Sequence, residues 1–206
     1  MLIALLVGPA PALPPRPIFA RILRLLRPQT GLKGVSQGAL DNQPDSIHLR
    51  RRSFEWQNQA ALHRLTGPLL ARSFSEVGDF SVAEMPELKV RLLLKRANST
   101  YACVCEHPHL GTWLDLVACY QDGSIATFST ARDSGVEQRP EDLTVYAPDL
   151  SADMLYTRML QERPQQSLVN VDAKNVVRLF QDAYQQQTGW RKKHDAAGPD
   201  VAKGVA

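Results

Sequence analysis

The sequence lacks the features that mark a disulfide-stabilised, membrane-spanning or nucleic-acid-binding protein. It holds only three cysteines, two of them separated by a single residue, so it has no disulfide framework and favours a reducing compartment. Its net charge of +3 is too small to indicate nucleic-acid binding by itself. No apolar run reaches the roughly 20 residues that a membrane-spanning helix needs. We therefore predict a cytoplasmic protein that has no nucleic-acid partner.

Sequence signatures of catalysis are also missing. The chain has no G-x-x-x-x-G-K-[ST] phosphate loop, no G-x-G-x-x-G after a strand, no G-x-S-x-G and no H-E-x-x-H. With 44% hydrophobic residues it can build an ordinary core without help from metals. We therefore expect a non-catalytic protein and predict no cofactor.

Residues 1–27 combine an apolar stretch with a basic amphipathic segment. Residues 2–13 are apolar but too short to cross a bilayer. Arg21, Arg24 and Arg27 then recur every three residues beside an apolar side. A segment of this kind can lie on an anionic membrane surface, which would be the inner face of the membrane for a cytoplasmic protein. Docking of the segment on its own domain or on a partner fits the pattern equally well.

The rest of the chain divides by composition into a linker, one domain and a tail. Residues 28–50 are polar and rich in glycine and proline, which predicts a flexible linker. Residues 51–190 carry the regular hydrophobic patterns of a single domain. Residues 191–206 are charged and contain glycine, which predicts a disordered tail.

Helical spacing occurs at both ends of this domain. An apolar stripe predicts a helix over 51–65, interrupted by Gly67-Pro68. A second helix is predicted over 151–162, and a third follows Asp172 and extends to about Trp190.

Between Val77 and Thr130 the hydrophobic pattern alternates with a period of two, which indicates strands. The intervening loops are short, so the strands should form an antiparallel meander. We predict an α+β fold, in which a curved antiparallel sheet of about five strands packs against the C-terminal helices. The predicted strands are 77–83, 88–96, 100–107, 112–121 and 124–130.

The run of Cys103, Cys105, His107 and His109 places thiols and imidazoles on one face of a strand. These groups suggest a soft-metal site, but four alternate residues span about 20 Å, too far for one ion. The ligand set that remains open is Cys103, Cys105 and His107 with Cys119. Burial is the favoured interpretation, because a two-residue turn at Asn98-Ser99 would set the cysteines opposite leucines. His107 and His109 remain ligand-binding candidates at the strand end.

Asp115 is an acid in an otherwise apolar strand. A two-residue turn at Asp122-Gly123 would pair Asp115 with Thr130 and place Phe128 on the same face. Such an acid can face a ligand cavity, or it can lie at the rim of the sheet. The ligand-binding candidates here are Asp115, Trp113 and Tyr101.

Three functions remain open from these observations. The first is a non-catalytic binding or interaction module held near a membrane by residues 1–27, with an unknown protein partner. The second is a small-molecule or lipid-binding domain whose pocket lies between sheet and helices. The third is a zinc or redox protein that uses Cys103, Cys105, His107 and Cys119.

Overall fold

The computed structural model describes residues 44–133 and 138–196, so residues 1–27 and most of the predicted linker lie outside the described part. The elements in chain order are β1 (Leu49–Arg51), α2 (Gln59–Ala71), β2 (Ser75–Val82), β3 (Met85–Lys95), β4 (Thr100–His107), β5 (Gly111–Cys119), β6 (Ile125–Ser129), β7 (Leu143–Tyr146), α3 (Ala152–Glu162) and α4 (Val176–Ala196).

The strands form one sheet in which spatial order follows chain order from β1 to β7. Neighbours from β1 to β6 are antiparallel, whereas β7 is parallel to β6. The predicted α+β class is confirmed, and all five predicted strands are present. The sheet has seven strands rather than about five and is not strongly curved. The two additional strands, β1 and β7, lie at its edges.

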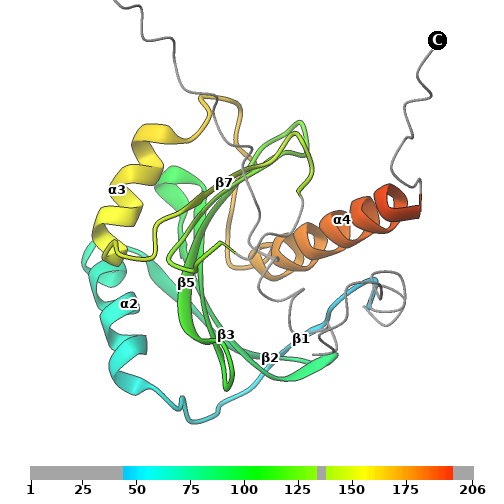
Figure 1. The fold of residues 1–206 in the computed structure, drawn as a ribbon. Coiled ribbons are helices and arrows are strands. Elements are labelled where there is room, and N and C mark those ends of the chain that lie inside the picture. The colour runs from blue at the N-terminus through cyan, green and yellow to red at the C-terminus, as the bar shows by residue number, and fades with distance from the viewer. Residues whose placement is uncertain (1–43, 134–137, 197–206) are drawn as a thin grey trace, which may run out of the picture.

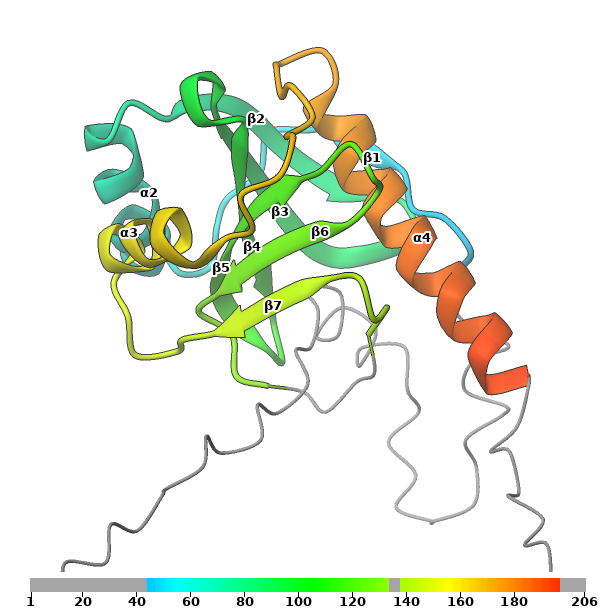
Figure 2. The same cartoon turned by 90° about the horizontal axis from the view of Figure 1, so that it is seen from above.

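Helices cover both faces of this sheet (Figures 1 and 2). Helices α2 and α3 lie side by side on one face and enclose a core that includes Leu93, Val104 and Phe128. Helix α4 crosses the other face and encloses a second core that includes Leu92 and Tyr101. The two C-terminal helices, α3 and α4, therefore lie on opposite faces of the sheet. Successive side chains of a strand point to opposite faces, so each helix buries every second side chain of the strands beneath it.

The chain passes from one face to the other between α3 and α4. Along this connection the backbone N–H of Val169 donates to the carbonyl of Cys119, at 2.8 Å. The N–H of Gln121 likewise donates to the carbonyl of Ser167, at 2.9 Å. These bonds fix the connection across the end of β5, so that α4 begins where it can cover β4 and β5.

The first helix differs from its predicted range of 51–65. It begins after Asn58, whose side chain accepts a hydrogen bond from the N–H of Ala61. It then continues through Gly67 and Pro68 to Ala71. Continuing the helix buries Leu69 completely, and this burial offsets the backbone hydrogen bond that a proline inside a helix loses.

The domain boundaries also differ at both ends. The described end of the predicted linker over 28–50 belongs to the folded domain, because Ile47 is buried and β1 begins at Leu49. Residues 191–196 of the predicted tail belong to α4, which continues beyond Trp190 to Ala196, and residues 197–206 lie outside the described part.

The turns set registers that differ from the predicted ones. Between β3 and β4 a short 3₁₀ turn over Arg96–Asn98 pairs Leu92 with Cys103, a shift of two residues that leaves every side chain on its predicted face. Between β5 and β6 the shift is one residue, so Asp115 pairs with Ser129 and not with Thr130. A one-residue shift exchanges faces. The predicted place of Phe128 beside Asp115 is therefore wrong.

Candidate functional site

The sheet face beneath α4 carries an unusual number of polar and thiol side chains. Cross-strand pairing sets Cys103 opposite Asp115 and Cys105 opposite Trp113. Ser129 follows on the next strand, opposite Asp115. All five side chains are buried within the core that α4 covers.

Three of these groups come together closely enough to act as a unit. The sulfur atoms of Cys103 and Cys105 and a carboxylate oxygen of Asp115 lie within 4.8 Å of one another. The indole N–H of Trp113 donates to Oδ2 of Asp115 at 2.9 Å and so orients the carboxylate. The neighbouring Cys105 thiol, burial and the Asp115 carboxylate raise the pKa of Cys103 well above its usual value. Burial and the raised pKa keep the Cys103 thiol protonated and away from solvent, so it is not an exposed nucleophile.

Tyr101 lies at the edge of the same cluster. Its hydroxyl is completely buried and has no hydrogen-bond partner among the described residues. Burial, followed by the neighbouring Cys119, Cys103 and Asp115 side chains, raises its pKa well above 10.0. The three predicted ligand-binding candidates Tyr101, Trp113 and Asp115 thus lie on one buried face.

The two histidines lie apart from this cluster, at the far end of β4. His107 is buried, and its Nδ1 accepts a hydrogen bond from the backbone N–H of His109 at 3.2 Å. Its Nε2 lies 3.4 Å from Oε2 of Glu87. Burial lowers the pKa of His107, although Glu87 opposes this effect. His109 is exposed and lies beyond the end of the strand.

The structure groups the sequence-predicted metal ligands differently from the pattern in the sequence. Cys103 and Cys105 are together, but the third group near them is Asp115. Cys119 is a buried free thiol whose pKa burial raises to about 12, and it lies beside Tyr101. The alternation in β4 indicated the thiol face. The contribution of Asp115 required the pairing of β4 with β5, which the sequence pattern alone does not specify.

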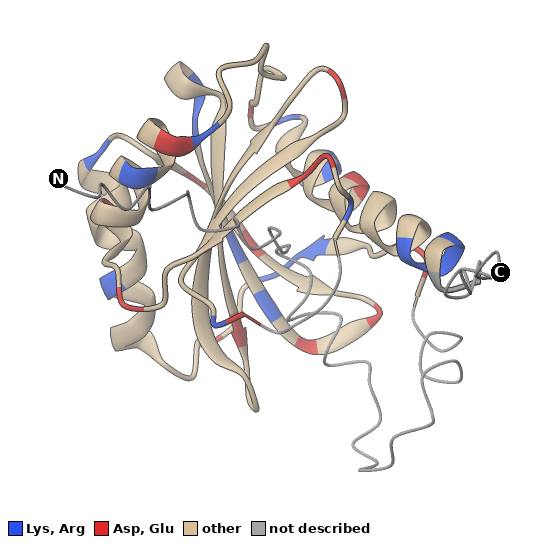
Figure 3. Cartoon of the chain, turned by 45° about the horizontal axis from the view of Figure 1, so that its top comes forward, with Lys and Arg blue, Asp and Glu red and all other residues tan. Residues whose placement is uncertain are grey.

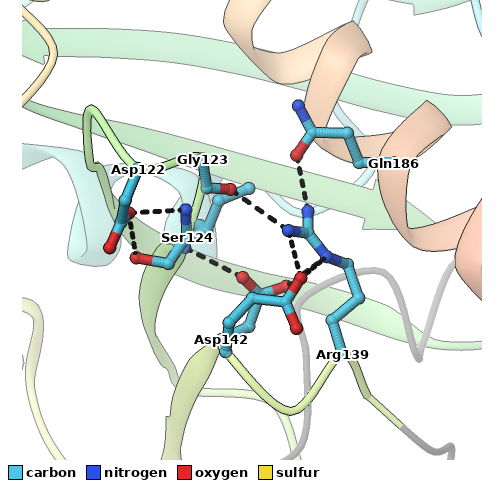
Figure 4. Close-up of polar contacts among 8 residues, drawn as sticks. Asp122, Gly123, Ser124, Arg139, Asp142 and Gln186 are labelled. Atoms are coloured by element: carbon cyan, nitrogen blue, oxygen red, sulfur yellow. Dashed lines mark hydrogen bonds and ion pairs between the residues drawn. The ribbon is translucent and has the colours of Figure 1, made fainter.

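A second polar network joins the β5–β6 hairpin, the segment before β7, and α4 (Figure 4). Arg139 is its centre: Nη1 donates to Oε1 of Gln186 at 2.6 Å, and Nη2 donates to the carbonyl of Gly123 at 3.3 Å. Its Nε donates to Oε1 of Glu141 at 2.8 Å. One guanidinium therefore ties three segments together, and the network is a structural clamp.

Asp142 belongs to this network and is nearly buried. Its Oδ1 accepts a hydrogen bond from the backbone N–H of Ile125 at 2.9 Å, and its Oδ2 lies 3.9 Å from Nε of Arg139. Burial raises the pKa of Asp142 to about 6, even though Arg139 and the Ile125 N–H act in the opposite direction.

The start of the described domain lies against the basic end of α4. The hydroxyl of Tyr184 donates to the carbonyl of Pro44 at 3.3 Å, and Lys192 forms an ion pair with Asp45. Lys193 on the same turn is exposed. Figure 3 shows the Lys and Arg positions that gather on the last turns of α4.

Three consecutive arginines lie at the end of the edge strand β1 and directly after it. Arg50, Arg51 and Arg52 are exposed there, and Nη2 of Arg51 donates to the carbonyl of Val77 at 2.9 Å. Charged side chains on a short edge strand hinder pairing with another chain, so these arginines protect the edge of the sheet. The predicted membrane-surface residues Arg21, Arg24 and Arg27 lie outside the described residues.

Within residues 44–133 and 138–196, no helix is both long enough and apolar enough to cross a membrane. Comparison with known proteins finds no matching family model, no matching curated protein and no matching solved structure.

Proposed function

We propose that this chain is a non-catalytic binding module that associates with an anionic membrane surface through residues 1–27. The observation that carries the proposal is the contact between Asp45 and Lys192. Because of this contact, the described domain begins next to the basic end of α4, and the segment that contains Arg21, Arg24 and Arg27 precedes this point in the sequence. Basic groups from both ends of the chain can then act on one anionic surface.

The expected strength is that of reversible surface binding. Each Lys or Arg near an anionic surface contributes about 1 kcal/mol, and the effect extends only about one Debye length. The apolar side of the segment, with Phe19, Ile22 and Leu25, adds a hydrophobic contribution when it enters the headgroup region.

The buried chemistry of the domain favours binding over catalysis. Cys103, Cys105 and Asp115 are completely buried beneath α4, so they do not meet a substrate at the surface. Some exposed charged groups of the described domain form ion pairs with each other, such as Arg72–Asp153 and Arg158–Glu162. These observations support a stable scaffold that presents its surface to a partner.

Flotation with vesicles tests the membrane part of this proposal. The full chain should float with vesicles that contain phosphatidylserine and should remain unbound with phosphatidylcholine alone. The triple variant R21Q/R24Q/R27Q should bind about a hundredfold more weakly at low salt, from about 1 kcal/mol for each arginine. The control R50Q/R52Q/R158Q changes the net charge equally within the folded domain. Equal loss in both variants, or no flotation of the full chain, would overturn the proposal.

A second candidate function is a small-molecule or lipid site between the sheet and α4. It is favoured by the convergence of Tyr101, Trp113 and Asp115 on one buried face. Native mass spectrometry of gently purified full chain should then show a bound species that is lost in a Trp113→Ala variant. A mass equal to that of the chain alone in every preparation would argue against this candidate.

A further inference from the structure

The cluster beneath α4 has the composition of a metal centre. Two thiols and a carboxylate, all completely buried, bring their ligand atoms within 4.8 Å of one another. We propose that Cys103, Cys105 and Asp115 form a binding site for one thiophilic divalent cation of the zinc class.

The strand geometry supplies the arrangement that such an ion needs. Cys103 and Asp115 are direct cross-strand partners, and Cys105 is the next residue on the same face of β4. In a tetrahedral zinc site with Zn–S bonds of about 2.3 Å, ligand atoms are about 3.5–3.8 Å apart. The most widely separated of the three atoms therefore need to approach one another by about 1.0–1.3 Å, a distance within the range of side-chain rotation.

Two aromatic residues complete the surroundings. The indole of Trp113 donates to Oδ2 of Asp115 and holds the carboxylate in place, as partners of metal ligands commonly do. The Tyr101 hydroxyl is buried and makes no geometrically defined hydrogen bond among the described residues; burial, then the neighbouring Cys119, Cys103 and Asp115 side chains, raise its pKa. A bound cation would give this oxygen a role, either as the fourth ligand or as the partner of a metal-bound water.

The other two ligands predicted from the sequence, His107 and Cys119, do not belong to this site. His107 engages the His109 backbone and Glu87, and it lies beyond Cys105 toward the strand end. Cys119 is buried on the same face but outside the cluster. Cys119 is therefore a matched control: it is the same residue type, on the same face, and also buried beneath α4.

Access to the site depends on α4. Val176, Phe180 and Tyr184 belong to the core that covers the cluster, so a cation cannot reach it through the folded surface. Loading should occur when α4 is not yet packed against the sheet, during folding or a transient opening. The experiment must therefore add the metal during refolding.

Metal binding is tested on full-length protein without a histidine tag, refolded with Zn²⁺ or Co²⁺ and then desalted. The wild-type chain should retain one ion, and the cobalt form should show a sulfur-to-cobalt charge-transfer band. C103S, C105S and D115N should each bind at least about tenfold more weakly, whereas C119S should stay within about twofold. Retention of no ion, or equal loss in C119S and C105S, would overturn the proposal.

X-ray absorption of the zinc-loaded wild-type chain gives a result that does not depend on whether the variants fold. Two sulfur and at least one oxygen neighbour at zinc are expected. A shell of only nitrogen and oxygen, or one with imidazole nitrogen, contradicts this ligand set.

Discussion

Oδ1 of Asp142 accepts the backbone N–H of Ile125, while Oδ2 lies 3.9 Å from Nε of Arg139. Burial nevertheless raises the pKa of this carboxyl from 3.8 to about 6. The folded state therefore holds this proton more tightly than the unfolded chain does. The protonated Asp142 carboxyl therefore stabilises the folded state fully below pH 3.8, and this stabilisation is lost as the pH rises through about 6. A shift of this size corresponds to about 3 kcal/mol.

Asp142→Asn should remove the decrease in the free energy of unfolding that accompanies a rise in pH toward 6, because an asparagine does not titrate. Urea unfolding at intervals between pH 4 and pH 7 measures the effect as the difference between variant and wild type. Asp122→Asn is the control: Asp122 lies in the same hairpin but is exposed, and hydrogen bonds from Ser124 lower its pKa. In the control variant, the free energy of unfolding should still decrease between pH 4 and pH 6. An unchanged pH dependence in Asp142→Asn would contradict the prediction.

The apolar residues between Val77 and Thr130 and the short turns among them were enough to locate the five central strands, although β4 and most of β5 are buried on both faces by helices. Such signals were not enough for β1 and β7, which have three and four residues and are too short to show a period. The two cysteines of β4 were assigned to the correct face because the β3–β4 register shifted by an even number of residues.

The neighbourhood of Asp115 could not be predicted because it depends on one turn. Asp122-Gly123 matches a two-residue hairpin, but the structure has a three-residue loop in which Tyr120 and Ser124 flank the turn. Gly123 adopts a φ of 87°, and the Asp122 carboxylate accepts hydrogen bonds from both the N–H and the hydroxyl of Ser124. These local bonds shift β6 by one residue and bring Ser129 beside Asp115.

Phe128 tests the observed register through its packing. It is completely buried in the core that α2 and α3 cover. Phe128→Ala should lower the free energy of unfolding by about 3–5 kcal/mol, from lost burial and the remaining cavity. Met154→Ala removes a comparably large apolar side chain that is 57% exposed on α3, and it should cost less than about 1 kcal/mol. Equal costs in the two variants would be inconsistent with this packing.

Asn58 determines where α2 begins. Its side-chain oxygen accepts the N–H of Ala61, which would otherwise lack a partner in the first turn. Asn58→Ala should destabilise the protein by about 1 kcal/mol, and Asn58→Asp should retain most of the stability because aspartate caps equally well. Chemical denaturation of the three proteins measures both effects, and an Asp variant as unstable as the Ala variant would exclude a capping role.

Glu106 holds the segment that leads into α2 against the sheet. Its carboxylate is buried and accepts the backbone N–H groups of Gln57 and Asn58, at 2.8 and 2.9 Å, as well as Nζ of Lys89 at 3.1 Å. These hydrogen bonds lower its pKa although burial acts to raise it.

Glu106→Gln replaces one accepting oxygen with an amide NH₂, which cannot accept a backbone N–H and leaves Lys89 without its carboxylate. The loss should be about 1.5–3 kcal/mol, the range for hydrogen bonds to a charged group. It should show as faster hydrogen exchange at the Gln57 and Asn58 amides. Glu55→Gln is the matched control, because Glu55 is exposed on the same segment. The wild-type pKa is lowered, so the contribution of Glu106 is present above its ordinary pKa of 4.5 and disappears as the pH falls below it. Unchanged amide exchange in Glu106→Gln would show that the segment is held by other contacts.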